Sequence, residues 1–189
     1  MNKYGYEIED FSIGEFNFNP LQKGSPTKFT QEQLFNLEKL IKIGDFVIDI
    51  GAYTGDTTLE FAIATGCNGK VIAFEPNVAV FPILEKNTDL FNAQLYKNKI
   101  FCYNLAVMSV GGEIELNYVD SDFCNGGFGV INGPFVQKVK TVNLEDFIFR
   151  NYRDDFSRIA LIKIDTEGQE FNILKSSQGL LHRNKPILL

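Results

Sequence analysis

The sequence has very few of the residues that build metal clusters and disulfide frameworks. It contains one histidine and three cysteines, and the cysteines (Cys67, Cys102 and Cys124) are far apart and odd in number. No CxxC pair is present, so the sequence indicates neither a zinc site of the usual spacing nor a set of paired disulfides. We therefore expect a reduced, cytoplasmic setting and assign no metal ligands.

Long apolar runs and clusters of basic residues are also lacking. No apolar run approaches 18 residues, and the N-terminus has no basic-then-apolar leader, so neither a membrane span nor a secretory signal is indicated. The net charge is -6, from 24 acidic and 18 basic residues. This balance argues against nucleic acid and against an anionic membrane surface as partners, because both are bound by clustered lysine and arginine.

What is present is the composition of one globular domain. The 189 residues are 44% hydrophobic, enough to bury a substantial core. Residues 1–29 have no sustained period and are interpreted as an irregular N-terminal arm, with one short strand near Tyr6–Ile13. Residues 30–189 are interpreted as the folded domain. Thr30 and Gln33 form a capping-box pattern that predicts a helix ending at Gly44.

Strand and helix patterns alternate from Gly44 onward. Wholly apolar runs, such as Val71–Phe74, are typical of strands buried on both faces. The expected strands are 46–50, 71–74, 99–109, 111–119, 136–142, 159–165 and a last one begun at 185–189. The expected helices are 57–64, 78–90 (with Pro82 in its first turn), 143–149 and one through 171–174, and 120–134 is expected to be loop. This order predicts a doubly wound α/β fold with a mostly parallel sheet and helices on both faces.

Three predicted strands end in acidic residues or glycine, at Asp49–Gly51, Glu75 and Asp165–Glu167. Ligands of such sheets bind beyond the carboxyl ends of the strands, so we expect these residues to meet at one site. Gly51 and Gly55 allow the backbone to approach a ligand closely. Glu75 lies 24 residues after Gly51 and is placed to accept hydrogen bonds from ribose hydroxyls.

The glycine turn favours one nucleoside ligand over another. A dinucleotide such as NAD prefers G-x-G-x-x-G, and here Tyr53 stands where the second glycine would be. Asp49 would also lie close to the two phosphates. S-adenosylmethionine has no phosphate and carries an ammonium and a sulfonium, which Asp49 and the turn carbonyls suit by charge. The residues therefore favour S-adenosylmethionine, with NAD as the alternative.

Five segments, in this order, resemble the FkbM family of S-adenosylmethionine-dependent methyltransferases: "VIDIGAYTGDTT", "VIAFEPN", "LAVMS", "TVNLEDF" and "LIKIDTEGQEFNILKSS". The resemblance begins near Gly44 and implies a Rossmann-like, class I methyltransferase fold. It also implies O-methylation of a hydroxyl on a sugar or polyketide-like natural product, a small-molecule acceptor. The site residues it implies are Asp49, Gly51, Tyr53 and Gly55 in the donor turn, Glu75 at the ribose, Asn77 at the adenine, and Asp165 and Glu167 beside the donor and acceptor.

The sequence departs from the family pattern in two places. Lys175-Ser176-Ser177 stands where a glycine is common, and the chain stops at "KPILL", where the sheet of such enzymes continues. We therefore expect a C-terminally truncated domain in which part of the acceptor pocket is absent.

Asp165 and Glu167 are the candidates for catalysis. An alcohol acceptor must lose its proton to a base, or to a metal that lowers its pKa, and a carboxylate pair can serve either purpose. The structural alternative is that Asp165 forms the turn and Glu167 caps the next helix. His182 is expected at the surface, in a turn after the last helix. Lys163, inside a strand, needs a partner, and the alternatives are Asp49, Glu75 or the donor's carboxylate.

Three functions follow from these patterns. The first is a methyltransferase acting on a hydroxyl, the second an NAD-dependent oxidoreductase, and the third a non-catalytic module that binds S-adenosylmethionine. Loop 120–134, with glycines beside Phe123 and Phe128, is either a lid over the substrate or a plain surface loop. The acceptor, the metal requirement and the oligomeric state have no signature in the sequence.

Overall fold

The structure is a computed structural model that describes residues 36–94, 99–118, 135–166 and 168–189. The short strand expected near Tyr6–Ile13 and the loop expected over 120–134 lie outside these ranges. The division into an arm and a domain at residue 30 therefore stays a prediction. Within the described ranges, no helix combines the length and apolarity needed to cross a bilayer.

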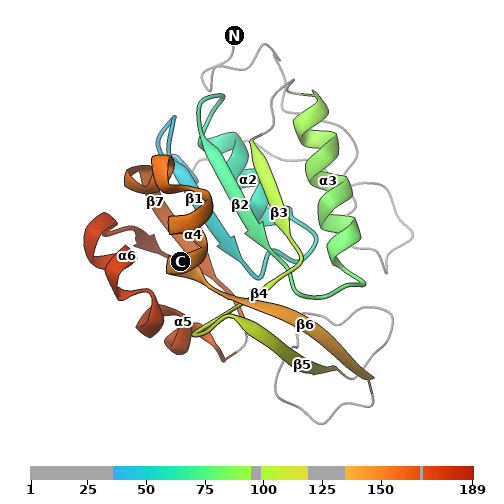
Figure 1. Cartoon of the computed structure of the whole chain (residues 1–189). Coiled ribbons are helices and arrows are strands. Elements are labelled where there is room, and N and C mark those ends of the chain that lie inside the picture. The colour runs from blue at the N-terminus through green and yellow to red at the C-terminus, as the bar shows by residue number, and fades with distance from the viewer. Residues whose placement is uncertain (1–35, 95–98, 119–134, 167) are drawn as a thin grey trace.

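A parallel sheet forms the centre of the described chain (Figure 1). Its five described strands lie in the order β3-β2-β1-β7-β8, and each neighbouring pair is parallel. Their bounds are β1 Phe46–Ile50, β2 Lys70–Phe74, β3 Ile100–Tyr103, β7 Ile159–Ile164 and β8 Ile187–Leu188. The predicted doubly wound α/β fold is confirmed.

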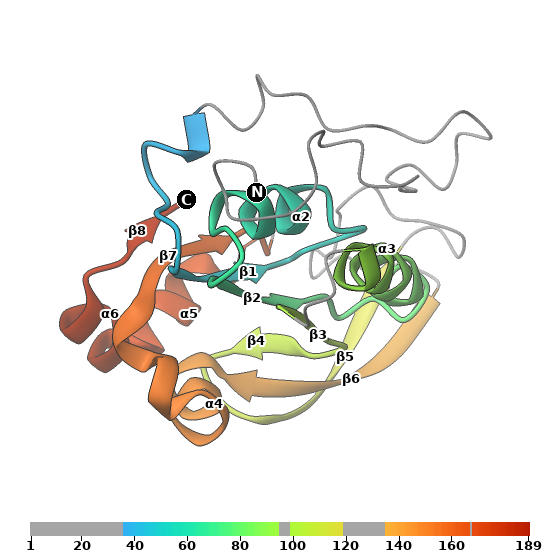
Figure 2. The ribbon, with the colours of Figure 1, turned by 90° about the horizontal axis from the view of Figure 1, so that it is seen from above.

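Helices cover both faces of this sheet (Figure 2). On one face lie α2 (Asp56–Ala64) and α3 (Phe81–Gln94). On the other lie α4 (Leu144–Asn151), α5 (Glu170–Ser176) and α6 (Gln178–Asn184), and the short 3-10 helix η1 (Arg153–Arg158) follows α4. Successive residues of β1 pack into the cores on opposite faces of the sheet, as a pleated strand requires. Val47 packs with Leu59 of α2, whereas Ile48 packs with Ile148 of α4.

A second, smaller sheet corrects the prediction of one continuous strand over 99–109. That segment forms β3 and then β4 (Ala106–Met108), which belong to different sheets. The small sheet has the described order β4-β6-β5, with β5 (Gly112–Tyr118) antiparallel to β6 (Phe135–Asn143). Asn104 lies at the break, and its Nδ2 donates to the carbonyls of Glu75 (2.8 Å) and Pro76 (3.1 Å).

Two predicted helix boundaries are also wrong. The described part of the first helix ends near Leu37, before the left-handed turn at Gly44 (φ 96°). Helix α3 begins at Phe81 rather than Val78, because Asn77 holds a turn in which its Oδ1 accepts from the N–H of Ala79 (2.8 Å). Pro82 does lie in the first turn of α3, as predicted.

The predicted start of α4 is confirmed and offers a stability test. The Asn143 side chain accepts from the N–H of Asp146 at 3.0 Å, as a helix N-cap does. We expect Asn143→Ala to lower the free energy of unfolding by about 1 kcal/mol in urea denaturation. Asn151→Ala is the control, since the exposed amide of Asn151 donates to the carbonyl of Phe147 within the last turn of the same helix. An equal loss of unfolding free energy in the two variants would contradict the capping role of Asn143.

Candidate active site

The carboxyl ends of β1, β2 and β7 bring the predicted acidic residues to one edge of the sheet. β1 lies between the other two, and in Figure 1 the arrowheads of β1 and β2 point toward the small sheet. The N–H of Asp165 donates to the carbonyl of Ile50 at 3.0 Å, and the N–H of Gly51 donates to that of Phe74 at 2.9 Å. Asp49, Glu75 and Asp165 therefore belong to one continuous edge.

The turn after β1, residues 51–55, depends on its glycines for packing. Gly51 has φ 78°, and a Cβ added there would lie 2.0 Å from the carbonyl oxygen of Asp165. Gly55 has φ 94° at the start of α2, and a Cβ there would lie 2.9 Å from Leu84. Tyr53 also adopts a left-handed conformation, with φ 51°. The packing of Asp165, the residue that follows β7, thus requires a glycine at position 51.

Asp49 is completely buried, and protein groups occupy its carboxylate. It accepts from the hydroxyls of Thr58 (2.6 Å) and Thr57 (3.2 Å), and from the ammonium of Lys163 (3.1 Å). The partner of Lys163, which the sequence left open, is therefore Asp49. The ammonium thus balances the charge of Asp49 within the protein, and the carboxylate joins β1 to α2 and β7. The two threonines were missed, although both lie in the first turn of α2.

Lys163 links β1 to β7 at the site. Besides Asp49, its Nζ donates to the carbonyl of Gly51 at 3.0 Å and lies 3.7 Å from Oδ2 of Asp165. Its side chain is only 12% exposed, so these contacts satisfy an otherwise costly buried charge. The lysine thus holds the turn after β1 against the end of β7.

Glu75 is a nearly buried carboxylate, 5% exposed, at the end of β2. Its Oε2 accepts from the N–H of Tyr53 (2.9 Å) and its Oε1 from the N–H of Asn77 (2.8 Å). Burial raises its pKa from 4.5 to about 7, against the lowering effect of these hydrogen bonds. The folded state favours the protonated form of Glu75. Its contribution to the free energy of unfolding is therefore lost as the pH rises from about 4.5 to about 7.

The turn after β2, residues 75–80, is held from two other elements. Asn104 bonds the carbonyls of Glu75 and Pro76, and Gln137 of β6 donates its Nε2 to the carbonyl of Pro76 at 2.9 Å. Asn77, expected at the adenine, is buried, and its Oδ1 is used within the turn. Asn104 and Gln137 were missed, because no local pattern marks an amide that bonds a distant turn.

The end of β7 presents an open carboxylate. The side chain of Asp165 is 71% exposed, whereas Glu167 lies outside the described residues. Glu170 holds the turn here, since its carboxylate accepts from the N–H groups of Thr166 (3.0 Å) and Gly168 (2.9 Å). Hydrogen bonds from its own backbone and from Gly168 lower its pKa. Glu170 thus has a structural role of the kind considered for Glu167. The capping-box spacing could not have indicated it, because Thr166 and Glu170 are four residues apart rather than three.

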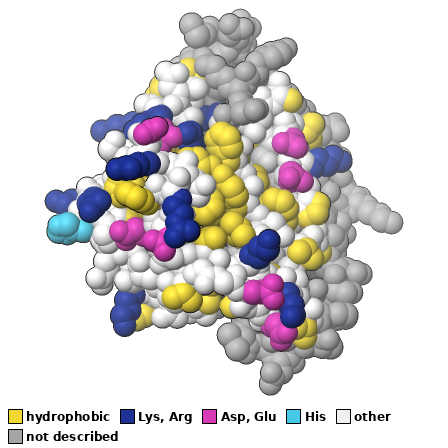
Figure 3. All heavy atoms as spheres, in the orientation of Figure 1, with side chains coloured by type: hydrophobic (Ala, Val, Ile, Leu, Met, Phe, Trp, Pro, Cys, Tyr) yellow, Lys and Arg dark blue, Asp and Glu magenta, His cyan; other side chains and the backbone are white. Residues whose placement is uncertain are grey.

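The remaining candidates lie apart from this edge. His182 is in α6 rather than in a turn, and it is exposed at the margin of the face in Figure 3, as the surface interpretation expected.

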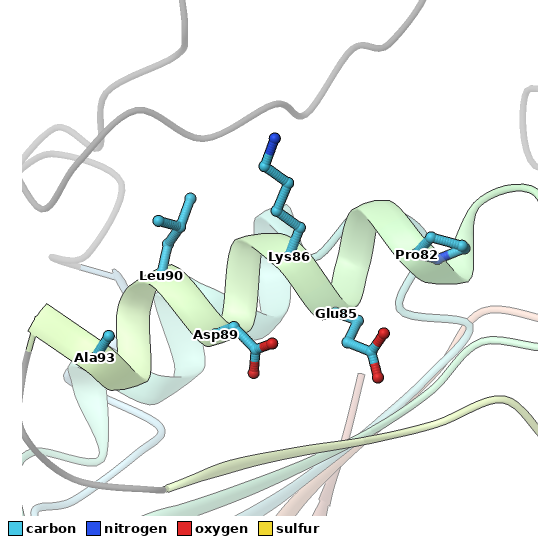
Figure 4. Close-up of a pocket in the computed structure, with 6 residues that line it drawn as sticks. All are labelled: Pro82, Glu85, Lys86, Asp89, Leu90 and Ala93. Atoms are coloured by element: carbon cyan, nitrogen blue, oxygen red, sulfur yellow. The ribbon is translucent and has the colours of Figure 1, made fainter.

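A hollow of ≈ 410 Å³ is lined by residues of α3. Glu85 and Asp89 point to one side of this helix, and Lys86 and Leu90 point to the other (Figure 4). Among the described residues, no three His, Cys, Asp or Glu side chains group as they would around a metal ion.

Comparison with solved structures identifies the fold. The FkbM methyltransferase from Methylobacillus flagellatus KT superposes with a TM-score of 0.56 at 18% identity, over 77% of this chain and 32% of that one. An S-adenosylmethionine-dependent methyltransferase from Agrobacterium tumefaciens gives a TM-score of 0.40 at 18% identity, over 84% and 39% of the two chains. The second value is too low to support an argument. The fold is that of the class I S-adenosylmethionine-dependent methyltransferases.

The sequence itself identifies the family. The methyltransferase FkbM domain family matches residues 49–189, which is most of the chain, so the chain belongs to this family. The resemblance noted in the sequence is therefore confirmed. No curated protein matches significantly. The chain spans about a third of the length of the Methylobacillus structure.

Proposed function

We propose that this chain binds S-adenosylmethionine at the carboxyl edge of β1, β2 and β7 and transfers a methyl group to a hydroxyl of a small molecule. The observation that carries the proposal is Glu75, a carboxylate at the end of β2 that is bonded to the turn after β1. In a sheet of this class, that position faces the ribose of the ligand. Family membership supports methyl transfer as the reaction.

The residues present fit the donor. A carboxylate offers about four acceptor sites, and Glu75 uses one on each oxygen for backbone N–H groups, which leaves capacity for the ribose hydroxyls. The backbone of residues 51–55, including Gly51, Tyr53 and Gly55, borders the amino-acid end, with Asp49 fixing its shape. Asn77 and the half-exposed Val78 next to it border the adenine.

Asp165 is proposed to take the proton of the acceptor hydroxyl. The bound donor supplies an electrophilic methyl group on a sulfonium, and the protein must align the acceptor oxygen with it. Asp165 has the open carboxylate at this edge, and Lys163 lies 3.7 Å away, on the protein side. Glu167 is proposed to act beside it, as a second base or as a metal ligand.

The acceptor is proposed to be a sugar or a ring-containing natural product. Phe171, in the first turn of α5, is 73% exposed and follows Asp165 closely in the sequence. An exposed aromatic ring in the helix that follows the proposed base can pack against an apolar ring face of the acceptor. This contact would orient the hydroxyl without adding charge to the site.

The pH dependence of donor binding tests the role of Glu75. Ribose hydroxyls donate to the ionised carboxylate, so binding of S-adenosylhomocysteine should strengthen as the pH rises through about 7. From that pKa, we expect calorimetry to show a gain approaching tenfold in affinity between roughly pH 6 and 8. Glu75→Gln should remove the dependence and weaken binding at pH 8 by about 1–3 kcal/mol.

Glu60→Gln provides the matched control. Burial and the neighbouring Asp56 also raise the pKa of Glu60, but this glutamate lies within α2 and is not one of the proposed site residues. Its variant should bind like the unmodified protein at every pH. A pH dependence that persists in Glu75→Gln would show that another group is responsible and that Glu75 does not hold the ribose.

A further inference from the structure

Gln137 connects the small sheet to the turn after β2. It lies on β6 opposite Leu116 of β5 and is only 8% exposed. Its Nε2 donates to the carbonyl of Pro76 at 2.9 Å, and its Oε1 accepts from the N–H of Val78 in a longer contact of 3.4 Å. One side-chain amide therefore bonds the backbone on both sides of Asn77, much as a neighbouring strand would.

Asn104 holds the same turn from the link between β3 and β4. Its Nδ2 donates to the carbonyls of Glu75 (2.8 Å) and Pro76 (3.1 Å). The carbonyl of Pro76 thus accepts from two amides that come from different elements. Buried or half-buried backbone groups outside regular structure need such partners, and the conformation of the turn depends on them.

The conformation of this turn sets the position of Glu75. The carboxylate of Glu75 accepts from the N–H of Asn77, which is the residue that Gln137 brackets. If the turn moves, this N–H moves as well, and the carboxylate loses one of the two hydrogen bonds that aim it. A change on β6 would therefore reach the proposed ribose contact through two hydrogen bonds.

We infer that Gln137, assisted by Asn104, is a positioning residue for the donor nucleoside, so that the small β4-β6-β5 sheet is part of the donor site. The inference rests on the proposed function. It gives the small sheet a role that its sequence does not suggest. Because binding free energies are reciprocal, a group that contacts this sheet and shifts Gln137 would also change donor affinity.

The test measures binding rather than turnover. Gln137→Met keeps the length of the side chain but removes both polar atoms. We expect it to weaken S-adenosylhomocysteine and 5′-methylthioadenosine by the same factor, about tenfold, in calorimetry. An equal factor is expected because both ligands carry the nucleoside and only the first carries the amino-acid tail.

Thr141→Val is the matched control on the same strand. Thr141 is also buried, and its Oγ1 donates to the carbonyl of Val110 at 3.0 Å, away from the turn. Thr141→Val should lower the melting temperature about as much as Gln137→Met does. Its dissociation constants for both ligands should stay within about twofold of those of the unmodified protein. If Gln137→Met does not fold, Asn104→Ala tests the same turn from the other element, with the same expected loss.

The outcomes separate the two claims. The positioning role alone is overturned if folded Gln137→Met binds both ligands with dissociation constants within twofold of those of the unmodified protein. If Gln137→Met does not fold, the same result in Asn104→Ala overturns it. Loss of the first ligand with no loss of the second also overturns it, because the effect would then lie at the amino-acid end. An unmodified protein that binds neither ligand overturns the proposed function, and the inference with it.

Discussion

Gly51→Ala is expected to cost more than about 4 kcal/mol of unfolding free energy, which few single substitutions do. Two effects add at this position. The residue has φ 78°, where a side chain costs about 1–2 kcal/mol. The new Cβ would also lie 2.0 Å from the carbonyl oxygen of Asp165 and 2.9 Å from its carbonyl carbon. Asp165 follows β7 directly and its N–H is bonded to the carbonyl of Ile50, so its backbone cannot move aside cheaply and the ends of β1 and β7 would separate at the site.

Gly44→Ala separates the two effects. Gly44 also has a positive φ, 96°, but nothing lies within 4 Å of a Cβ added there. Its variant should lose only the conformational part, about 1–2 kcal/mol in urea denaturation. Similar losses in the two variants would mean that the packing of Gly51 against β7 is looser than the structure shows. Folded Gly51→Ala protein should also bind S-adenosylhomocysteine poorly, since residues 51–55 are proposed to border the donor.

Lys163→Met is expected to cost about 3–5 kcal/mol, because it leaves the buried carboxylate of Asp49 without its cation. The hydroxyls of Thr57 and Thr58 would still donate to this carboxylate, but neither carries a charge. Adding Asp49→Asn to the variant removes the unpaired charge. We therefore expect the double variant to be less destabilised than the sum of the single variants, by about 0.5–3 kcal/mol.

Lys138→Met is the control for this pair. Lys138 lies on β6, and its Nζ is 3.8 Å from Glu113, with both side chains more than half exposed. Exposed pairs contribute about 0–1 kcal/mol, so this substitution should change urea denaturation little. A loss of unfolding free energy in Lys163→Met as small as in Lys138→Met would contradict the stabilising role of the buried ion pair between β1 and β7.

The sequence predicted the layers of the fold because their signals are local. The apolar run Val71–Phe74 indicated a strand buried on both faces, and β2 is buried from Val71 onward. Asn143 indicated a helix start and is the cap of α4. The break between β3 and β4 was not predictable in this way. It lies at Asn104, whose partners are carbonyls of a turn nearly 30 residues away in the chain.

The candidate site was predicted in its location but not in its internal bonding. The ends of β1, β2 and β7 meet as expected, because parallel strands place their carboxyl ends at one edge. The sequence left the partner of Lys163 open among three groups, and the structure pairs it with Asp49. Which of several polar groups pair across a sheet depends on strand order and register, and a single sequence does not display these.

The most direct test of the central claim is calorimetric titration of the unmodified protein at pH 8, with S-adenosylhomocysteine in one experiment and NAD in the other. The account predicts binding of S-adenosylhomocysteine at one site per chain and no binding of NAD. Glu75 would then hold the ribose, and the turn 51–55 the amino-acid end. Binding of NAD without S-adenosylhomocysteine, or of neither ligand, would contradict the proposal that this edge of the sheet is a methyl-donor site.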